Sequence, residues 1–231
     1  MAVNRDLSSD DSRVHIFATD NEAFVAVAAA VTELVKLGIS KNQTSNVILA
    51  GGNSISKTLS LLSNIDTDWS NVSWYLADER CVDAESNLRN DKQIADVLRN
   101  SLGAHYGHIF SPSSYLPPKE AADEYASRIE RINMFDFCLL GMGNDGHIAS
   151  LLPNHQALDS NRVCCEITDS PNPPAQRVTL TLKMFAQVEN RILVTTGSSK
   201  SDSVTDYTTN PKSPVRLYNP TEIFADEAAY S

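Results

Sequence analysis

The segment FDFCLLGMGNDGHIASLLP, residues 135–153, decides the fold. Its first half is a mostly apolar run that stops at a glycine-rich turn, and Pro153 closes the segment. A short apolar run bounded by turn residues is typical of a buried strand in a parallel sheet. We therefore predict a strand over residues 135–143, followed by a tight turn that carries Asp145 and His147.

Other apolar runs on either side of this segment end in the same way, in glycines or in charged residues. They predict strands over residues 46–52 (NVILAGG) and 72–80 (VSWYLADER), with further strand candidates over 177–185 and 191–197. Between them lie segments with apolar residues at helical spacing, which predict helices over 20–38, 54–63, 86–102 and 117–132.

Strands that alternate with helices predict an α/β fold, Rossmann-like, with a mostly parallel sheet and helices on both faces. We expect Asp20 or Asn21 to cap the first helix and Gly38 to end it. The proline-rich stretch 169–176 is short and predicts a loop, and no internal repeat or linker is evident. We therefore take residues 1–231 as a single domain.

Composition narrows the function classes. The net charge is −10 and 42% of the residues are hydrophobic. The acidic balance disfavours a nucleic-acid surface but allows a small anionic ligand in a cleft. The first residues contain no apolar signal region and no long apolar stretch is present, so we expect a cytoplasmic protein with no membrane partner. The spacing of Cys81, Cys138, Cys164 and Cys165 predicts reduced thiols, without disulfides or a zinc site.

Three predicted strands end in unusual polar sequence: AGGNS (50–54), ADER (77–80) and GMGNDGH (141–147). In an open parallel sheet, ligands bind in the crevice outside the carboxyl ends of the strands. We therefore expect these three strand ends to converge on one binding site.

The turn at 141–147 allows three interpretations. Residues 141–146 fit the GxGxxG pattern of a dinucleotide fold, but Pro153 leaves little room for the helix that should follow. The glycines alone are compatible with a structural turn that needs positive φ. Neither interpretation explains an aspartate two residues before a histidine, whereas Asp145 beside His147 is an arrangement suited to a general base.

The other strand ends carry anion-binding candidates. The Gly51–Gly52 turn before a helix near Ser54 exposes backbone N–H groups at a positive helix end, or is simply a tight turn capped by Ser54. Arg80 is suited to a phosphate and Asp78 to sugar hydroxyls, unless the two form a local ion pair. Arg177 and Lys200 either complete a phosphate pocket or are surface charges. We expect the remaining histidines (His15, His105, His108 and His155) to be structural or exposed.

The ordered set AGGNS, WYLADERCVDAESN, FDFCLLGMGNDGHIASLLP, PPAQRVTLT and GSSK resembles the 6-phosphogluconolactonases. These enzymes share one α/β superfamily with glucosamine-6-phosphate deaminases and ribose-5-phosphate isomerases. The resemblance covers nearly the whole chain. It implies hydrolysis of 6-phospho-D-glucono-1,5-lactone to 6-phospho-D-gluconate in the oxidative pentose phosphate pathway, with no cofactor and no metal.

Carried over to matching positions, the resemblance makes His147 the general base with Asp145 beside it. Arg80, Arg177 and Lys200 would hold the phosphate and carboxyl region of the substrate. It further implies a small-molecule substrate as the partner and a monomer or weak homodimer. The full set of implied substrate-binding residues is Gly51, Gly52, Asn53, Ser54, Asp78, Arg80, Asn87, Arg177 and Lys200.

Two departures from the family pattern concern binding. Gly-Gly-Asn-Ser-Ile (51–55) stands where members usually have Gly-Gly-Ser-Thr-Pro, and Asn172 stands where a lysine is common. The deaminases resemble DGHIAFNEP, with a glutamate after the histidine, whereas this chain has Ser-Leu-Leu-Pro at 150–153. Two alternatives stay open: a sister sugar-phosphate isomerase or deaminase, and a non-catalytic sugar-phosphate-binding or regulatory protein.

Overall fold

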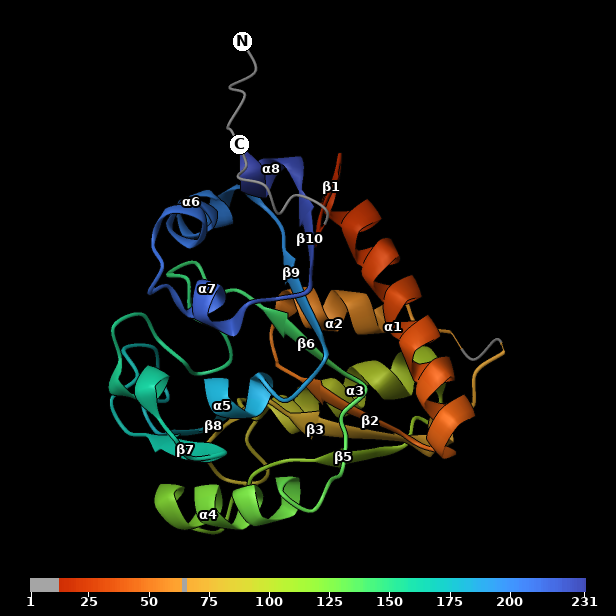
Figure 1. Cartoon of the computed structure of the whole chain (residues 1–231). Helices are drawn as coiled ribbons and strands as arrows, with labels where there is room; N and C mark the ends of the chain where they lie inside the picture. Colours follow the sequence, from red (N-terminus) through yellow and green to blue (C-terminus); the bar gives the residue numbers. More distant parts are fainter. Residues whose placement is uncertain (1–12, 64–65) are drawn as a thin grey trace.

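Short apolar runs build a seven-stranded sheet in the computed structural model, which describes residues 13–63 and 66–231 (Figure 1). The strand order is β1-β10-β9-β6-β2-β3-β5, and every pairing is parallel. The predicted α/β fold with a mostly parallel sheet is therefore confirmed. The strands are β1 Val14–Phe17, β2 Ser45–Leu49, β3 Val72–Leu76, β5 His108–Phe110, β6 Phe137–Gly141, β9 Asn190–Thr195 and β10 Glu222–Asp226.

Helices cover both faces of this sheet. The side chains of alternate β6 residues divide between two apolar clusters, Cys138 and Leu140 in one and Phe137 and Leu139 in the other. One face is covered by α1 Asp20–Asn42, α2 Asn53–Ser60 and α3 Asn90–Leu102. The other is covered by α4 Pro118–Ile129, α5 Leu182–Phe185, α6 Ser201–Thr209, α7 Pro214–Tyr218 and α8 Glu227–Tyr230. Short 3-10 turns lie at η2 Trp69–Asn71, η3 Gln156–Asp159 and η4 Ser198–Lys200.

The predicted limits of helix α1 were wrong at both ends. Thr19, not Asp20 or Asn21, is the N-cap and forms a capping box with Glu22. The helix continues past Gly38 to Asn42. Gly38 is a packing residue, because a Cβ there would lie 2.7 Å from the Asp136 carboxylate oxygen Oδ2.

Helix α1 is also long and apolar enough, by length and composition, to cross a membrane, with a mean hydropathy of 1.7 over an 18-residue window. Its buried face, which includes Phe24, Val31 and Val35, packs in the cluster shared with the sheet. Part of its apolar character is thus explained by the face that packs against the sheet.

A second, antiparallel sheet was not predicted. It consists of β4 Asp78–Arg80, β8 Arg177–Leu180 and β7 Cys164–Ile167, in the order β4-β8-β7. The predicted strand 72–80 is split at Ala77, whose N–H donates to Leu49 in the large sheet while its carbonyl accepts from Leu180. The predicted strand 177–185 is likewise split, because Thr181 caps α5.

The order of the strands places a crevice in the large sheet. From β2 the chain adds β3 and β5 on one side, and from β6 it adds β9 and β10 on the other. Neighbouring strands β2 and β6 therefore form the point at which the direction of winding reverses. Ligands of open α/β sheets bind outside the carboxyl ends of the strands at such a point.

Candidate functional site

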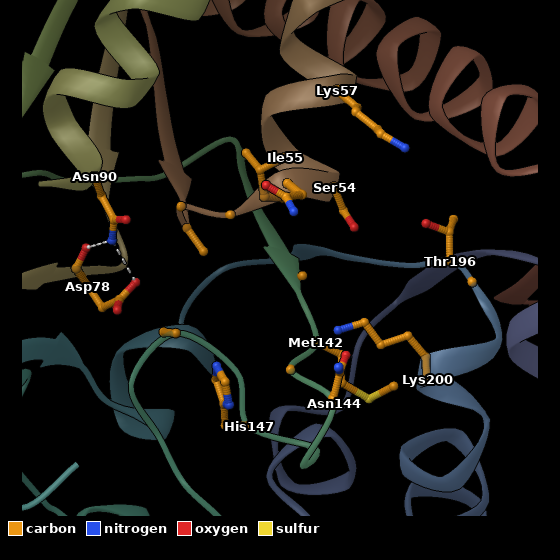
Figure 2. Close-up of a pocket in the computed structure, with 18 of the residues that line it drawn as sticks. Ser54, Ile55, Lys57, Asp78, Asn90, Met142, Asn144, His147, Thr196 and Lys200 are labelled. Carbon is orange, nitrogen blue, oxygen red and sulfur yellow. Dashed lines mark hydrogen bonds between the residues drawn. The ribbon is translucent and has the colours of Figure 1, made fainter. Parts of the chain in front are cut away.

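A cavity of about 520 Å³ lies at the carboxyl ends of β2, β6 and β9, with β4 and α3 along one side (Figure 2). The three strand ends that were predicted to converge do meet there. Of the residues named from the sequence, the cavity is lined by Gly51, Gly52, Asn53, Ser54, Asp78, Arg80, His147, Arg177 and Lys200.

The turn after β6 presents one histidine to this cavity. The Nδ1 atom of His147 lies 2.5 Å from Oδ1 of Asp145, and the backbone N–H of His147 donates to the same oxygen. The hydrogen bond from His147 lowers the pKa of Asp145 to about 2, although burial opposes the shift. Because Nδ1 is engaged, Nε2 is the ring nitrogen left for the cavity. Asp145 itself does not line the cavity and acts from behind His147.

Gly143 allows the imidazole to lie close to the backbone of the turn. A Cβ at Gly143 would lie 2.2 Å from both Cε1 and Nδ1 of His147. The backbone closes the same turn, since Gly143 N–H donates to the His147 carbonyl and Gly146, with φ +82°, donates to Gly143. The position of His147 therefore depends on a glycine at position 143, two residues beyond the end of β6, because any other residue would place a Cβ against the ring.

The dinucleotide interpretation of this turn fails. Residues after the glycines form no helix, and instead Ile148 makes isolated bridges to Met142 and Leu151. A phosphate-binding fingerprint needs a helix whose N-terminus faces the phosphate.

Among the described residues, no group of three or more His, Cys, Asp or Glu side chains is arranged to hold a metal ion.

Asp78 and Arg177 are linked through Ser150. The Ser150 hydroxyl donates to Asp78 at 2.6 Å, and Nη1 of Arg177 lies 3.4 Å from the Ser150 oxygen. Arg177 also donates to the backbone carbonyls of Pro174 and Asn172. Burial lowers the pKa of Arg177, with Asp78 opposing the shift. Several of the Arg177 donors are thus used to hold the loop before β8.

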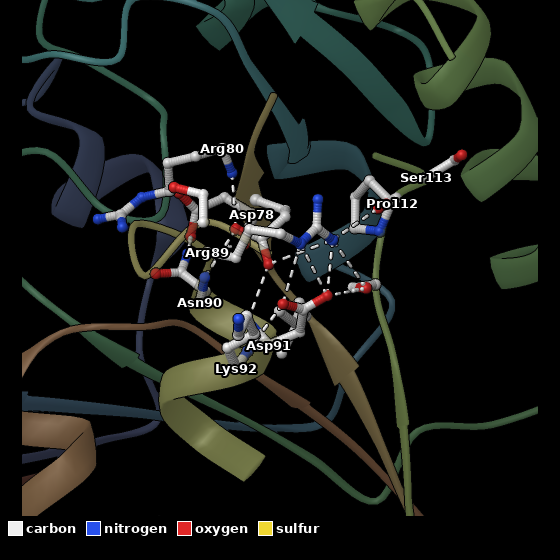
Figure 3. Close-up of polar contacts among 12 residues, drawn as sticks. Asp78, Arg80, Arg89, Asn90, Asp91, Lys92, Pro112 and Ser113 are labelled. Carbon is white, nitrogen blue, oxygen red and sulfur yellow. Dashed lines mark hydrogen bonds and ion pairs between the residues drawn. The ribbon is translucent and has the colours of Figure 1, made fainter. Parts of the chain in front are cut away.

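Strand β4 divides its side chains between the cavity and the opposite side. Asp78 and Arg80 line the cavity, and Nη1 of Arg80 donates to the Leu88 carbonyl at 2.6 Å. Glu79 is buried and accepts from the backbone N–H groups of Arg80, Asn90 and Asp91. Figure 3 labels these three donor residues among the polar contacts at the start of α3. Burial raises the pKa of Glu79 to about 7, although hydrogen bonds from the start of α3 oppose the shift. Glu79 therefore fixes the first turn of α3 beside the cavity.

The other side of the cavity is rich in hydrogen-bond donors. Gly52, at φ +105°, is the N-cap of α2 and provides no side-chain cap, so the predicted Ser54 cap is wrong. The first N–H groups of α2 therefore lie at the positive end of the helix, beside the cavity, and such an end favours an anion. Lys200 lies across from them with its side chain directed into the cavity (Figure 2), and burial lowers its pKa.

Lys57 and Asn90 line the cavity but were not predicted from the sequence. Lys57 lies one helical turn after Asn53, so the predicted helix carried a signal for it. It is ion-paired with Asp20 at 3.0 Å at the rim. Asn87, the implied substrate residue, does not line the cavity: it is exposed, and its carbonyl accepts from Gln93. The chain runs as an irregular loop until α3 begins, so Asn90 occupies the wall instead.

A second hollow of about 940 Å³ lies beside the edge strand β5, between α3 and α4. It contains none of the residues predicted to bind substrate. Its cations are each paired with a carboxylate: Arg89 with Asp91, Lys92 with Glu85 and Arg128 with Glu124. The first cavity is therefore the better candidate for an anionic ligand.

Comparison with known proteins places this geometry among relatives. The family model described as glucosamine-6-phosphate isomerases/6-phosphogluconolactonase matches residues 8–227. The chain is 30% identical to a probable 6-phosphogluconolactonase 2 of Oryza sativa subsp. indica, over 96% of this chain and 90% of that protein.

Solved structures share the fold. A 6-phosphogluconolactonase from Shewanella baltica OS155 superposes with a TM-score of 0.83 at 23% identity, over 94% of this chain and 98% of that one. A monomeric glucosamine-6-phosphate deaminase gives a TM-score of 0.79 at 16% identity, over 94% and 98%. Because proteins of both names share the fold, the choice between their activities rests on the residues in the cavity.

The interaction between Asp145 and His147 should make a pH-dependent contribution to the free energy of unfolding. The folded pKa of Asp145 is about 2, against an ordinary value of 3.8. A depressed carboxyl pKa contributes stability that is present above the unfolded value and is lost as the pH falls through the folded value. We expect the difference in Tm between wild type and Asp145→Asn to narrow as the pH falls from about 4 to about 2.

Calorimetric unfolding of both proteins across this range measures the effect. Asp159→Asn, which changes an exposed aspartate in η3, is the control for general acid destabilisation. A Tm difference for Asp145→Asn that stays constant down to about pH 2 would contradict the assignment.

Proposed function

The chain belongs to the glucosamine-6-phosphate isomerase/6-phosphogluconolactonase family, and we propose that within it the chain hydrolyses 6-phospho-D-glucono-1,5-lactone to 6-phospho-D-gluconate. This reaction is a step of the oxidative pentose phosphate pathway. The observation that carries the proposal is the pair of Asp145 and His147 at the cavity, with one ring nitrogen held by the carboxylate and the other left for the ligand.

Hydrolysis of a lactone needs a base for water and an acid for the leaving oxygen. In the proposed mechanism, Nε2 of His147 takes a proton from water as the water oxygen attacks C1. The tetrahedral intermediate then collapses, the bond between C1 and the ring oxygen breaks, and His147 returns the proton to that oxygen. Asp145 holds the imidazole in position and stabilises its protonated form. The chemistry as proposed uses no cofactor.

The phosphate is suited to the donor side of the cavity. Lys200 and the first turn of α2 present a cation and backbone N–H groups, and Arg80 adds a second cation from β4. Fixing the phosphate positions C1 relative to His147, and such positioning lowers the barrier without any new chemistry. The same positive groups also stabilise the negative charge of the tetrahedral intermediate at C1.

The segment after His147 favours hydrolysis over deamination. The family resemblance associates deaminases with the motif DGHIAFNEP, in which a glutamate stands directly before the proline, whereas this chain has Ser150, Leu151 and Leu152 before Pro153. Ser150 is buried and donates to Asp78, and both leucines are buried. This segment therefore contributes no second carboxylate to the cavity for ring opening.

Replacement of His147 tests the base directly. We expect His147→Ala to lower kcat at least about a hundredfold, because general acid–base catalysis contributes about 10²–10⁴-fold. KM should change little, since the phosphate-binding groups remain. The measurement is turnover of freshly generated lactone with the spontaneous rate subtracted.

His15→Ala is the matched control. His15 forms a similar pair with Glu222, also at 2.5 Å, but on the edge strand β1 outside the cavity. Turnover should persist in that variant. Near-normal kcat in His147→Ala would remove His147 as the base, and conversion of glucosamine 6-phosphate by wild type would favour the sister activity. Binding of 6-phosphogluconate without any turnover would favour a non-catalytic sugar-phosphate-binding protein.

The glycine turn gives a second test of the same mechanism. Gly143→Ala introduces a Cβ that overlaps the His147 ring, so the base must move, and we expect kcat to fall by about tenfold or more. Gly141→Ala is the control in the same segment, because its Cβ would meet only the Val194 carbonyl, at 3.8 Å. Equal rates for the two variants would show that the close contact between Gly143 and His147 does not matter.

A further inference from the structure

Asn90 lies in the wall of the cavity. Its side chain has a buried polar atom that forms no hydrogen bond with the residues that the structure describes. Asn90, the first residue of α3, is 1% exposed and lines the cavity. The amide Nδ2 donates to the Asp78 carbonyl at 3.0 Å. The amide Oδ1 has no hydrogen-bond partner within the described part of the chain. Buried carbonyl oxygens are nearly always paired, so an unpaired one at a binding site calls for a functional explanation.

The amide cannot turn to find a partner elsewhere. If oxygen and nitrogen exchanged places, an oxygen would face the Asp78 carbonyl, so the hydrogen bond fixes which atom is which. The backbone is fixed as well, because Glu79 accepts from the N–H groups of Asn90 and Asp91, and Nη2 of Arg89 lies 3.6 Å from Oε2 of Glu79. The oxygen is therefore held in one direction.

That direction is toward the Gly51–Gly52 turn, which lines the cavity. A Cβ on Gly51 would lie 2.1 Å from Oδ1 of Asn90, so only glycine fits against it. Figure 2 shows the Asn90 side chain with its nitrogen toward Asp78 and its oxygen on the side of the α2 turn. The oxygen thus lies between α3 and the Gly51–Gly52 turn, and residues of both line the cavity.

We propose that Asn90 is a specificity-determining residue whose Oδ1 accepts a hydrogen bond from a hydroxyl group of the substrate. The inference rests on the proposed function, because it assigns a role in the same cavity. An amide oxygen repels a phosphate or carboxylate but accepts readily from a neutral hydroxyl. Asp78, also an acceptor, lies beside it in the same wall.

The cavity then has two chemically different sides. Asp78 and Asn90 form an acceptor wall for hydroxyl groups, and Lys200 with the first turn of α2 forms a donor wall for the anionic group. A substrate with a phosphate at one end and hydroxyls along its length fits in one orientation only. Sites that hydrogen-bond a substrate hydroxyl with buried groups discriminate strongly against analogues that lack it.

The test measures binding, so that it does not depend on turnover. Calorimetric Kd values are compared for 6-phosphogluconate and its 2-deoxy, 3-deoxy and 4-deoxy analogues, with wild type and Asn90→Ala. We expect Asn90→Ala to raise the Kd for 6-phosphogluconate by about tenfold, which corresponds to the loss of one hydrogen bond. For one deoxy analogue, the same variant should change Kd less than about twofold, because the hydroxyl is already missing.

Asn100→Ala, which changes an exposed asparagine on the same helix, is the control and should leave every Kd unchanged. The calorimetric Kd of inorganic phosphate should be the same for wild type and Asn90→Ala, since phosphate uses the donor wall. Equal weakening of all four ligands by Asn90→Ala would reduce its role to packing and overturn the proposal.

Wild type alone provides an independent check if Asn90→Ala does not fold. Equal affinity of wild type for all four ligands would overturn the proposal without any variant. A protein that discriminates among the deoxy ligands through Asn90 but shows no lactone turnover would support the role of Asn90 while contradicting the lactonase assignment.

Discussion

The contact between the His147 ring and the backbone of Gly143 is the constraint on which the candidate site depends. The imidazole lies where a Cβ of residue 143 would be, and Asp145 holds it there at 2.5 Å. This arrangement is possible because β6 ends in a central position of the sheet, between β2 and β9. Everything else in the cavity is placed relative to that strand end: the glycine turn after β2, the polar strand β4 and the lysine after β9.

The small antiparallel sheet gives the cavity its second side. By leaving the large sheet at Ala77, the chain turns Asp78 and Arg80 toward the cavity and buries Glu79 behind them. Glu79 then fixes the start of α3 through two backbone N–H groups, which brings Asn90 against the glycine turn. A buried carboxylate is costly unless it is hydrogen-bonded, and here its hydrogen bonds set the position of a residue in the wall. The same residues thus serve core packing and shape the wall of the cavity.

Much of this arrangement could be predicted from the sequence, because it depends on local patterns. Apolar runs that end in glycine or charge identified the central strands, and their polar ends identified most of the cavity. The errors concern contacts between distant residues. Gly38 resembled a helix stop, but it is a packing position against Asp136. Asn87 matched a motif, yet the length of the loop before α3 places Asn90 in the wall. Ala77 has no feature that marks a change of sheet, since its partners come from residues 49 and 180.

A crystal structure with 6-phosphogluconate in the cavity is the most direct test of the account. If the cavity is the site of lactone hydrolysis, a C1 carboxylate oxygen will lie about 2.6–3.2 Å from Nε2 of His147. The phosphate will then lie toward Lys200 and the first turn of α2. A product bound with its carboxylate away from His147, or bound outside the cavity, would contradict the assignment of this histidine as the base.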